Sequence, residues 1–318
     1  MMPRLYSVLD TNIYRRLGAE EFASLRALER SRSVRAVASP WVALELLKHL
    51  GEPDSDDFAP ARHALKRLVE HCRTYDGSNY VLSFLASPES QIAYTMMQRP
   101  QTAWSPVTQI VGFVEAAADG DDANLALNRE GFQEIAVEVA RIEQSFVANF
   151  WTNVVRHSIP KATEWTAIVS TPAVRDAVLA ELRSPVTITA AAESIVRLAE
   201  ELEGSVVDST RERIVQTVAA RCEHALRFQA EMIRRLAEQG GDLSKRRRGN
   251  VVFDIYLASS ALMFAALDQL PMWVVTNDAL ISHAADEAGV AELVVTLDEY
   301  RDILTGGNPD ASAMAHTL

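Results

Sequence analysis

The stretch that decides the fold is MMPRLYSVLDTNIYRRL, residues 1–17. Residues 4–9 form a short apolar run, which is typical of a buried strand, and the turn-forming sequence DTN follows it directly. The predicted strand therefore ends on a carboxylate, Asp10. This carboxylate either caps the helix that comes next or stands at the edge of a sheet as part of a functional site.

Strand and helix patterns alternate at both ends of the chain. After the first strand we predict a helix from about Ile13 to Leu28, a strand over 34–39 and a helix that begins at Ser39-Pro40. Near the other end we predict a helix over 250–267, a strand over 271–276, a helix over 279–289, a strand over 291–297 and a helix over 297–304. Such alternation favours a parallel sheet with right-handed crossovers.

The middle of the chain has a different pattern. Apolar residues recur every three or four positions from Ile135 to Phe150 and from Ile214 to Leu236, which is typical of helices packed on one another. We therefore predict one discontinuous α/β domain, residues 1–50 plus 250–305. An all-α insertion over 53–249 interrupts this domain, and a flexible tail over 306–318 follows it.

Composition narrows the functional classes. The chain has 318 residues, 48% of them hydrophobic, and a formal net charge of −12. It can therefore bury a full core, and it is not coated with basic nucleic-acid contacts. Cys72 and Cys222 are far apart, which favours reduced thiols. The longest apolar stretch, VVFDIYLASSALMFAAL, carries an acid and looks too short or too polar to span a bilayer, so we expect a soluble, cytoplasmic protein with no membrane contact.

Four acidic residues recur where an α/β fold exposes functional side chains. Asp10 and Asp278 follow predicted strands, whereas Glu45 and Asp254 lie on helices that can reach the same edge of the sheet. Clustered carboxylates raise one another's pKa unless a cation neutralises them, and hard oxygen ligands select Mg²⁺ or Mn²⁺. A metal ion held in this way can activate water for attack on a phosphodiester. We therefore predict that all four acids are metal ligands and catalytic residues.

The segments around these acids resemble the motifs of PIN-domain ribonucleases. The matching segments are, in order, LDTN (9–12), SPWVALEL (39–46), DIYLASSA (254–261) and VVTND (274–278). The resemblance covers the two ends of the chain. It implies a PIN-like parallel sheet sandwiched by helices, and metal-dependent endonucleolytic cleavage of RNA to products that carry 5′-phosphates.

The resemblance also implies roles for polar residues beside the acids. Asn12 corresponds to the family's polar residue that supports the first acid. Thr276 and Asn277 correspond to the turn that holds the fourth acid through backbone and hydroxyl hydrogen bonds. These three side chains are therefore expected to position the carboxylates.

The insertion is a departure from small toxin-type members of the family. Those members have a short helical segment between the second and third acids, whereas Glu45 and Asp254 are separated here by about two hundred residues. The insertion is expected to recognise substrate, to cover the site, or to bind a protein partner or an antitoxin-like inhibitor.

Basic residues near the acids are candidates for contact with a nucleic-acid backbone. Lys245, Arg246, Arg247 and Arg248 form a run just before Asp254, and Arg15 and Arg16 follow the DTN turn. The alternative for the run is a solvated loop or a patch that pairs with the protein's own acids. RNA is the expected substrate, and DNA is kept as an alternative substrate.

Other functions remain as alternatives. The α/β part could be a scaffold for a helical interaction module with weak or no catalysis. A phosphatase with an aspartyl nucleophile also begins with a strand that ends in Asp, but it needs a second Asp where this chain has Asn12. Taken singly, the acids also have structural explanations: Asp254 as a helix cap, Asp278 as a turn residue, and Glu45 on a solvated helix face beside Lys48.

Overall fold

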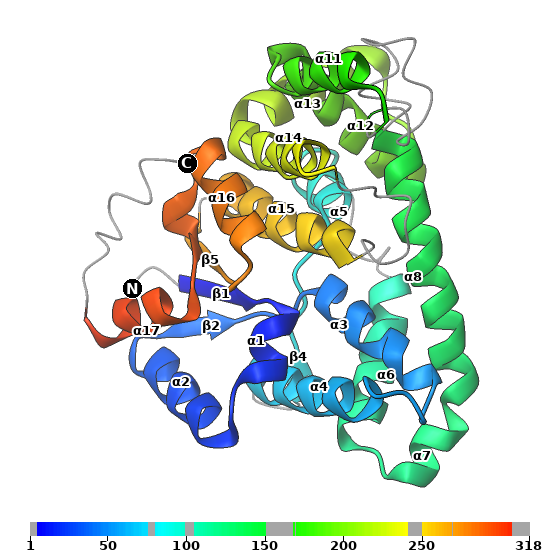
Figure 1. Ribbon diagram of the computed structural model, residues 1–318, viewed down its shortest axis with the longest axis vertical. Helices are drawn as coiled ribbons and strands as arrows, with labels where there is room; N and C mark the ends of the chain where they lie inside the picture. Colours follow the sequence, from blue (N-terminus) through cyan, green and yellow to red (C-terminus); the bar gives the residue numbers. More distant parts are fainter. Residues whose placement is uncertain are drawn as a thin grey trace.

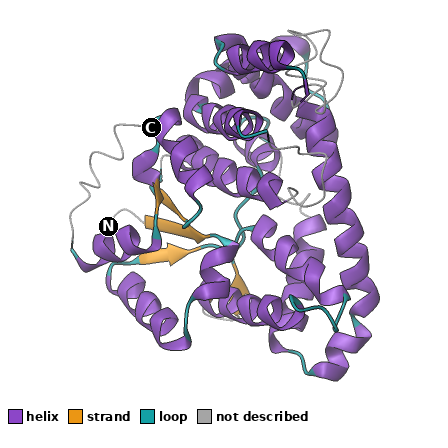
Figure 2. Ribbon diagram, in the orientation of Figure 1, coloured by secondary structure: helices purple, strands orange, loops and turns teal. Residues whose placement is uncertain are grey.

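A small parallel sheet lies at the centre of the fold (Figures 1 and 2). The computed structural model describes residues 5–75, 80–98, 105–150, 168, 170–240, 250–268 and 270–306. The sheet has the order β2-β1-β5-β6, with β1 (Leu5–Leu9), β2 (Val34–Ala36), β5 (Met272–Val275) and β6 (Val294–Val295). The two ends of the chain thus share one sheet, and the predicted α/β class is confirmed for a molecule that is otherwise mostly helical.

The register of the two central strands sets the relative position of the segments that follow their carboxyl ends. β1 lies between β2 and β5, with Leu5 opposite Val34 and Leu9 opposite Val275. All four strands run parallel, so their carboxyl ends meet at one edge of the sheet. β1 is buried over Ser7, Val8 and Leu9, and all of β5 is buried, as expected for a sheet covered on both faces.

The helices of the amino-terminal segment differ in one respect from prediction. The single helix expected over 13–28 is two helices, α1 (Thr11–Arg16) and α2 (Ala19–Ser31). Leu17 is extended and buried between them, and the backbone N–H of Gly18 donates to Glu21 Oε2 at 2.9 Å to start α2. Two further elements, α3 (Pro40–Leu47) and the 3-10 helix η1 (Lys48–Gly51), follow β2.

The carboxyl-terminal elements agree more closely with the sequence pattern. They are α15 (Asn250–Asp268), α16 (Ala279–Ala288), the 3-10 helix η5 (Ala291–Leu293) and α17 (Leu297–Thr305). Gly289 ends α16 with a φ of 75°, a conformation that favours glycine. The strand predicted over 291–297 is only the two residues of β6, because η5 occupies its first half.

The insertion is helical but not purely so. Its helices are α4 (Phe58–Cys72), α5 (Pro88–Thr95), α6 (Ser105–Asp119), α7 (Asp122–Leu127), α8 (Arg129–Phe150), α11 (Pro172–Leu182), α12 (Pro185–Glu203), α13 (Asp208–Arg221) and α14 (Glu223–Glu238). An antiparallel pair, β3 (Arg73–Tyr75) and β4 (Tyr80–Leu82), corrects the all-α prediction. The sequences RTY and YVL are rich in β-branched and aromatic residues, which favour strands.

The insertion packs directly on the α/β part. The segment after β4 pairs with the chain beyond β2, where Ala38 accepts a hydrogen bond from Leu85 and donates one to Ser83. Helices α4, α6 and α8 contact α3 or η1, and α14 contacts α15 and α16. In Figure 1, α8 runs along one side of the molecule and α11 to α14 cover one end. The predicted tail beyond residue 306 lies outside the described residues.

Helix α15 is the apolar stretch that was expected to be too short or too polar for a bilayer. Its window Val251–Asp268 is in fact long and apolar enough to cross one by length and composition. However, 72% of that window is buried inside the fold, against β5, α3, α5 and α14. This burial is typical of a core helix.

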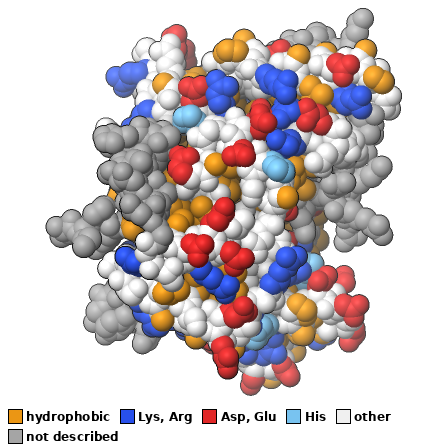
Figure 3. Space-filling model, turned by 60° about the vertical axis from the view of Figure 1, so that its left-hand side comes forward, with side chains coloured by type: hydrophobic (Ala, Val, Ile, Leu, Met, Phe, Trp, Pro, Cys, Tyr) orange, Lys and Arg blue, Asp and Glu red, His pale blue; other side chains and the backbone are white. Residues whose placement is uncertain are grey.

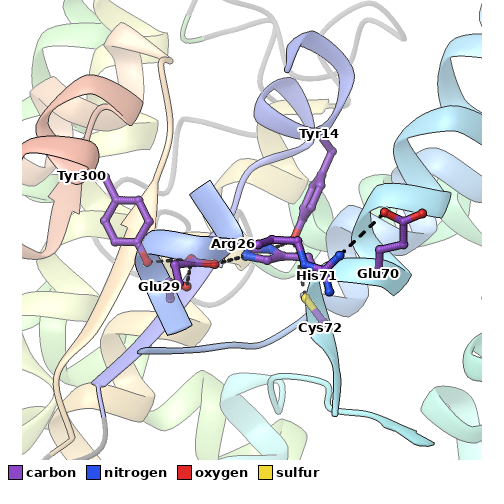
Figure 4. A network of polar contacts seen from close by, with 8 residues as sticks. Tyr14, Arg26, Glu29, Glu70, His71, Cys72 and Tyr300 are labelled. Carbon is purple, nitrogen blue, oxygen red and sulfur yellow. Dashed lines mark hydrogen bonds and ion pairs between the residues drawn. The ribbon is translucent and has the colours of Figure 1, made fainter. Parts of the chain in front are cut away.

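A buried polar network joins the sheet to the first helix of the insertion (Figure 4). His71 of α4 contacts Glu29 of α2 at 2.5 Å between Nε2 and Oε2. The same carboxylate accepts hydrogen bonds from Tyr300 of α17 at 2.8 Å and from Ser7 of β1 at 3.0 Å. The other ring nitrogen of His71 lies 2.9 Å from the hydroxyl of Tyr14 in α1. One carboxylate thus ties four elements together.

Each ionised partner stabilises the other in this network. Burial alone would lower the pKa of His71, but the carboxylate of Glu29 outweighs it and raises this pKa to about 10. Burial alone would raise the pKa of Glu29, but His71 and the hydroxyl donors hold it below its usual value. The pair is therefore ionised at neutral pH, where it holds α4 against the sheet.

We predict that Glu29→Gln lowers the free energy of unfolding by about 3 kcal/mol at pH 7, because it leaves His71 buried without its counter-charge. The contribution of His71 is complete below its unfolded pKa of 6.5 and is lost as the pH rises through about 10. The contribution of Glu29 is lost as the pH falls below 4.5. Urea unfolding at several pH values measures both effects, and the penalty of the variant should shrink above pH 10.

Glu70→Gln is the matched control for this measurement. Glu70 also lies on α4 and pairs with Arg26, but the two charges are 3.9 Å apart and Glu70 is exposed, so the change should stay below about 1 kcal/mol. Equal losses of unfolding free energy in the two variants would show that the buried pair stabilises the fold no more than the exposed residue does.

Candidate active site

Asp10 and Asp278 lie at the carboxyl ends of the two central strands. Asp10 directly follows β1, and its backbone N–H donates to Val275 O at 3.0 Å. Asp278 follows β5 after a two-residue turn and begins α16. The pairing of β1 with β5 therefore brings the first and fourth predicted acids to the same edge of the sheet.

Thr276 connects these two acids. Its hydroxyl donates to Asp10 Oδ2 at 2.8 Å and accepts from the backbone N–H of Asp278 at 3.0 Å. Asn12 adds a longer hydrogen bond, 3.4 Å from Nδ2 to the same Asp10 oxygen. Asn277 points elsewhere: its side-chain oxygen accepts from the backbone N–H of Leu297 and so anchors the start of α17. Thr276 and Asn12 thus occupy the supporting positions predicted for them, and Asn277 supports the neighbouring helix.

The helix-cap explanation applies differently to Asp10 and Asp278. Asp10 occupies the cap position of α1 but makes no capping hydrogen bond with its carboxylate. Asp278 does cap α16, because its Oδ1 accepts from the backbone N–H groups of Leu280 and Ile281. Its other oxygen is outside that interaction. Asp278 therefore has a structural role, and among the described residues its second carboxylate oxygen has no hydrogen-bond partner.

Glu45 is buried on α3, with only 7% of its surface exposed. The interpretation of a solvated helix face beside Lys48 is therefore wrong. Glu45 Oε2 accepts a hydrogen bond from the hydroxyl of Thr11 at 2.6 Å, and Thr11 directly follows Asp10. The carboxylate is thus tied to the segment that carries the first acid.

Asp254 is half-buried in the second turn of α15, which excludes a role as the helix cap. Among the described residues no hydrogen bond to its carboxylate is found. Burial raises its pKa well above the usual 3.8, and the charges of Asp10, Glu45 and Asp278 raise it further. All four predicted acids therefore interact through their charges in one region of the molecule.

The same repulsion acts on Asp10, and burial acts on both Asp10 and Glu45. Burial, together with the charges of Glu45 and Asp278, raises the pKa of Asp10 to about 6 despite the hydrogen bonds from Thr276 and Asn12. Burial also raises the pKa of Glu45, although the Thr11 hydroxyl and the charges of Lys48 and Arg15 oppose this. A site of this kind has an excess of negative charge that a bound cation would relieve.

The donor chemistry fits a hard divalent cation, but the four acids are not a ready-made coordination group. Among the residues that the structure describes, no three Asp, Glu, His or Cys side chains stand close enough together to hold a metal ion. The carboxylates are thus coupled by charge without being assembled around a common point. Carboxylate oxygens remain the ligands that Mg²⁺ and Mn²⁺ prefer.

Basic side chains lie beside Glu45. Arg15 approaches Asp57 at 3.5 Å, while its Nε and Nη2 are buried without a hydrogen-bond partner in the part of the chain that the structure describes. Lys48 lies 3.8 Å from Glu143 and above the ring of Phe253. Burial and these two cations lower the pKa of His49 to about 4. Arg16 is exposed, and the run 245–248 lies outside the described residues.

Sequence reasoning missed two contributors to the site. Thr11 stands in the DTN turn as an ordinary turn residue, and only the fold reveals that its hydroxyl reaches Glu45. Lys48 looked like a surface partner, but its charge acts on both Glu45 and Asp254. The signal for Thr11 was its position between two residues already assigned to the site.

No family model, characterised protein or solved structure gives a significant match to this chain. Its function is therefore argued from the geometry and charge of the site.

We predict that Asp254→Asn stabilises the metal-free protein by at least about 1 kcal/mol at pH 7.5, because it removes one of the mutually repelling carboxylates. Because the pKa of Asp254 is raised in the folded state, the wild-type protein loses stability as the pH rises and Asp254 ionises. The stability gained by Asp254→Asn should therefore shrink toward pH 4. Thermal unfolding in EDTA measures it. Asp286→Asn, at an exposed position on α16, is the control and should change little. A destabilised Asp254→Asn protein would contradict the electrostatic coupling.

Proposed function

We propose that the chain is a divalent-metal-dependent endonuclease with a PIN-like catalytic domain, and that it hydrolyses phosphodiester bonds in RNA. The observation that carries the proposal is the coupling of four carboxylates beside the carboxyl ends of β1 and β5. In open parallel sheets this edge is where ligands bind. Four carboxylates held in one region are a costly arrangement unless they serve a bound cation.

The ligands proposed for Mg²⁺ or Mn²⁺ are Asp10, Glu45, Asp254 and Asp278. When bound, the cation would neutralise these charges, polarise the scissile phosphate and lower the pKa of a water molecule. Nothing in the chemistry requires a nucleophilic side chain, because water is the attacking group.

The protein's own residues supply orientation. Thr276 fixes Asp10 and the backbone before Asp278, and the capping hydrogen bonds of α16 fix one oxygen of Asp278. Thr11 fixes one oxygen of Glu45, so that the other oxygen is proposed to orient the attacking water. Rigid support of this kind is what holds reacting groups in place for hydrolysis.

Arg15 is the proposed contact for a backbone phosphate. Two of its nitrogen atoms lack a hydrogen-bond partner among the described residues, and its charge acts on Glu45, so it lies near the acids. On the face in Figure 3, acidic and basic side chains are interspersed, so a nucleic acid would be held by local contacts. Arg16 and the run 245–248 are further candidates. RNA is the proposed substrate, with DNA as the alternative.

The cellular location of the protein and a surface for a protein partner are also proposed. We place the protein in the cytoplasm, and we propose that the insertion offers a surface for a protein partner or inhibitor. The packing of α8 against η1 and of α6 against α3 brings the insertion next to the helix that carries Glu45. A partner bound there would be close to the site.

A second candidate is a PIN-like scaffold without catalysis. The observation that favours it is the lack of three carboxylates close enough to form a metal group among the described residues. The two candidates differ in whether a divalent cation stabilises the protein, and in whether the loss of one carboxylate lowers the rate of RNA cleavage.

We predict that Asp278→Asn lowers the rate of RNA cleavage at least about a hundredfold in Mg²⁺ or Mn²⁺. Asparagine is also a good helix cap, so α16 should stay folded. The measurement is cleavage of labelled RNA and DNA in Mg²⁺, Mn²⁺ and EDTA, with Asp298→Asn on the exposed surface of α17 as the control. Cleavage that persists in EDTA, or that survives in the Asp278 variant, would exclude the proposed mechanism.

We also predict that Mn²⁺ raises the melting temperature of the wild-type protein and has a much smaller effect on Asp10→Asn. Binding to the folded state alone stabilises it by about 2.7 kcal/mol at a hundred times the dissociation constant. Thermal unfolding over a Mn²⁺ titration measures this. Equal shifts in both proteins would support the scaffold instead.

A further inference from the structure

A separate pocket lies in the helical part of the molecule, between α5, α12, α14 and α15. It has an empty volume of about 690 Å³, its open mouth included. Most of its wall is apolar, with Ile195 and Leu198 from α12, Leu226 and Ile233 from α14, and the rings of Phe146 and Tyr256. None of the four predicted metal ligands lines it. The pocket is therefore a site of its own.

One carboxylate stands in this apolar wall. Glu89 is the second residue of α5, and burial raises its pKa although its own backbone N–H and the hydroxyl of Ser87 oppose the shift. Among the described residues that line the pocket there is no Lys, Arg or His. Within the described residues no ion pair to Glu89 is found. In the part of the chain that the structure describes, this partly buried carboxylate thus has no counter-charge.

Aromatic faces stand beside this carboxylate. The rings of Phe146 and Tyr256 meet edge to face, with centroids 5.3 Å apart, and Tyr256 is stacked on Trp41 at 4.3 Å. Glu89 and Tyr256 line the same pocket, and burial together with the charge of Glu89 raises the pKa of the Tyr256 hydroxyl. Stacking on Trp41 fixes the orientation of the Tyr256 ring. An aromatic face and a carboxylate together attract a cation more strongly than either does alone.

Polar uncharged groups complete the lining. Gln229 of α14 and Ser194 of α12 are partly buried in the wall. A largely apolar pocket with a few polar groups at fixed positions is the usual form of a small-molecule site. Glu89 carries the one formal charge among the described lining residues, and this negative charge favours a cationic occupant.

We propose that this pocket binds a small organic cation, a primary amine on an aromatic or other apolar body. The ammonium group pairs with the carboxylate of Glu89, next to the ring of Tyr256. The apolar body fills the space between α12 and α14. This site does not depend on the proposed nuclease activity.

Tryptamine and tryptophol provide a direct test, because they share an indole ring and differ in an ammonium against a hydroxyl group. Isothermal titration of the full chain at pH 7 should show saturable binding of tryptamine at least tenfold tighter than that of tryptophol. Glu89→Gln should abolish this preference. Glu193→Gln, at an exposed position on α12, should keep it.

A second variant guards against loss of folding in the first. Ala191 lines the pocket on α12, and Ala191→Phe should fill it and weaken tryptamine binding at least tenfold. Circular dichroism checks that each variant is folded. The proposal is overturned if wild-type protein binds both compounds equally or neither, or if folded Glu89→Gln or Ala191→Phe binds tryptamine as the wild type does.

Discussion

The pairing of β1 with β5 is the interaction on which the rest of the structure depends. It joins residues at opposite ends of the chain, and its register places Leu9 opposite Val275. Because of this register, Asp10 and Thr276 share a hydrogen bond although they are 266 positions apart in the sequence. A slip of one residue would turn the side chains of β1 to the opposite face of the sheet and separate the acids. Geometry at the candidate site is therefore set by the sheet.

Local pattern was enough to predict much of this sheet and its edge. The apolar run before Asp10 and the run before Thr276 identified the two central strands, and alternation with helices predicted that they are parallel. The DTN and TND turns located two acids and the supporting side chains of Asn12 and Thr276, whereas Asn277 supports α17 instead. These features are short-range, so they can be read from a few neighbouring residues. The PIN-like identity of the domain and the binding of a metal ion stay predictions.

Long-range packing explains what could not be predicted. One expected helix is divided at Leu17 and Gly18, where the backbone is extended and the side chain of Leu17 is buried. The pair of Glu29 and His71 depends on α2 and α4 meeting, and neither residue has a local signal for it. The segment that follows β4 adds backbone contacts beyond β2 that no periodicity indicates. Each of these features depends on residues that are distant in sequence.

The position of β5 also has a consequence for synthesis of the chain. Translation releases β1 first, and β5 leaves the ribosome only after the whole insertion has been made. Contacts between such distant segments form late, because the intervening chain must be closed into a loop first. The nascent protein therefore carries Asp10 and Glu45 without their two later companions. If the chain is a ribonuclease, it stays inactive beside ribosomal RNA until nearly all of it has emerged.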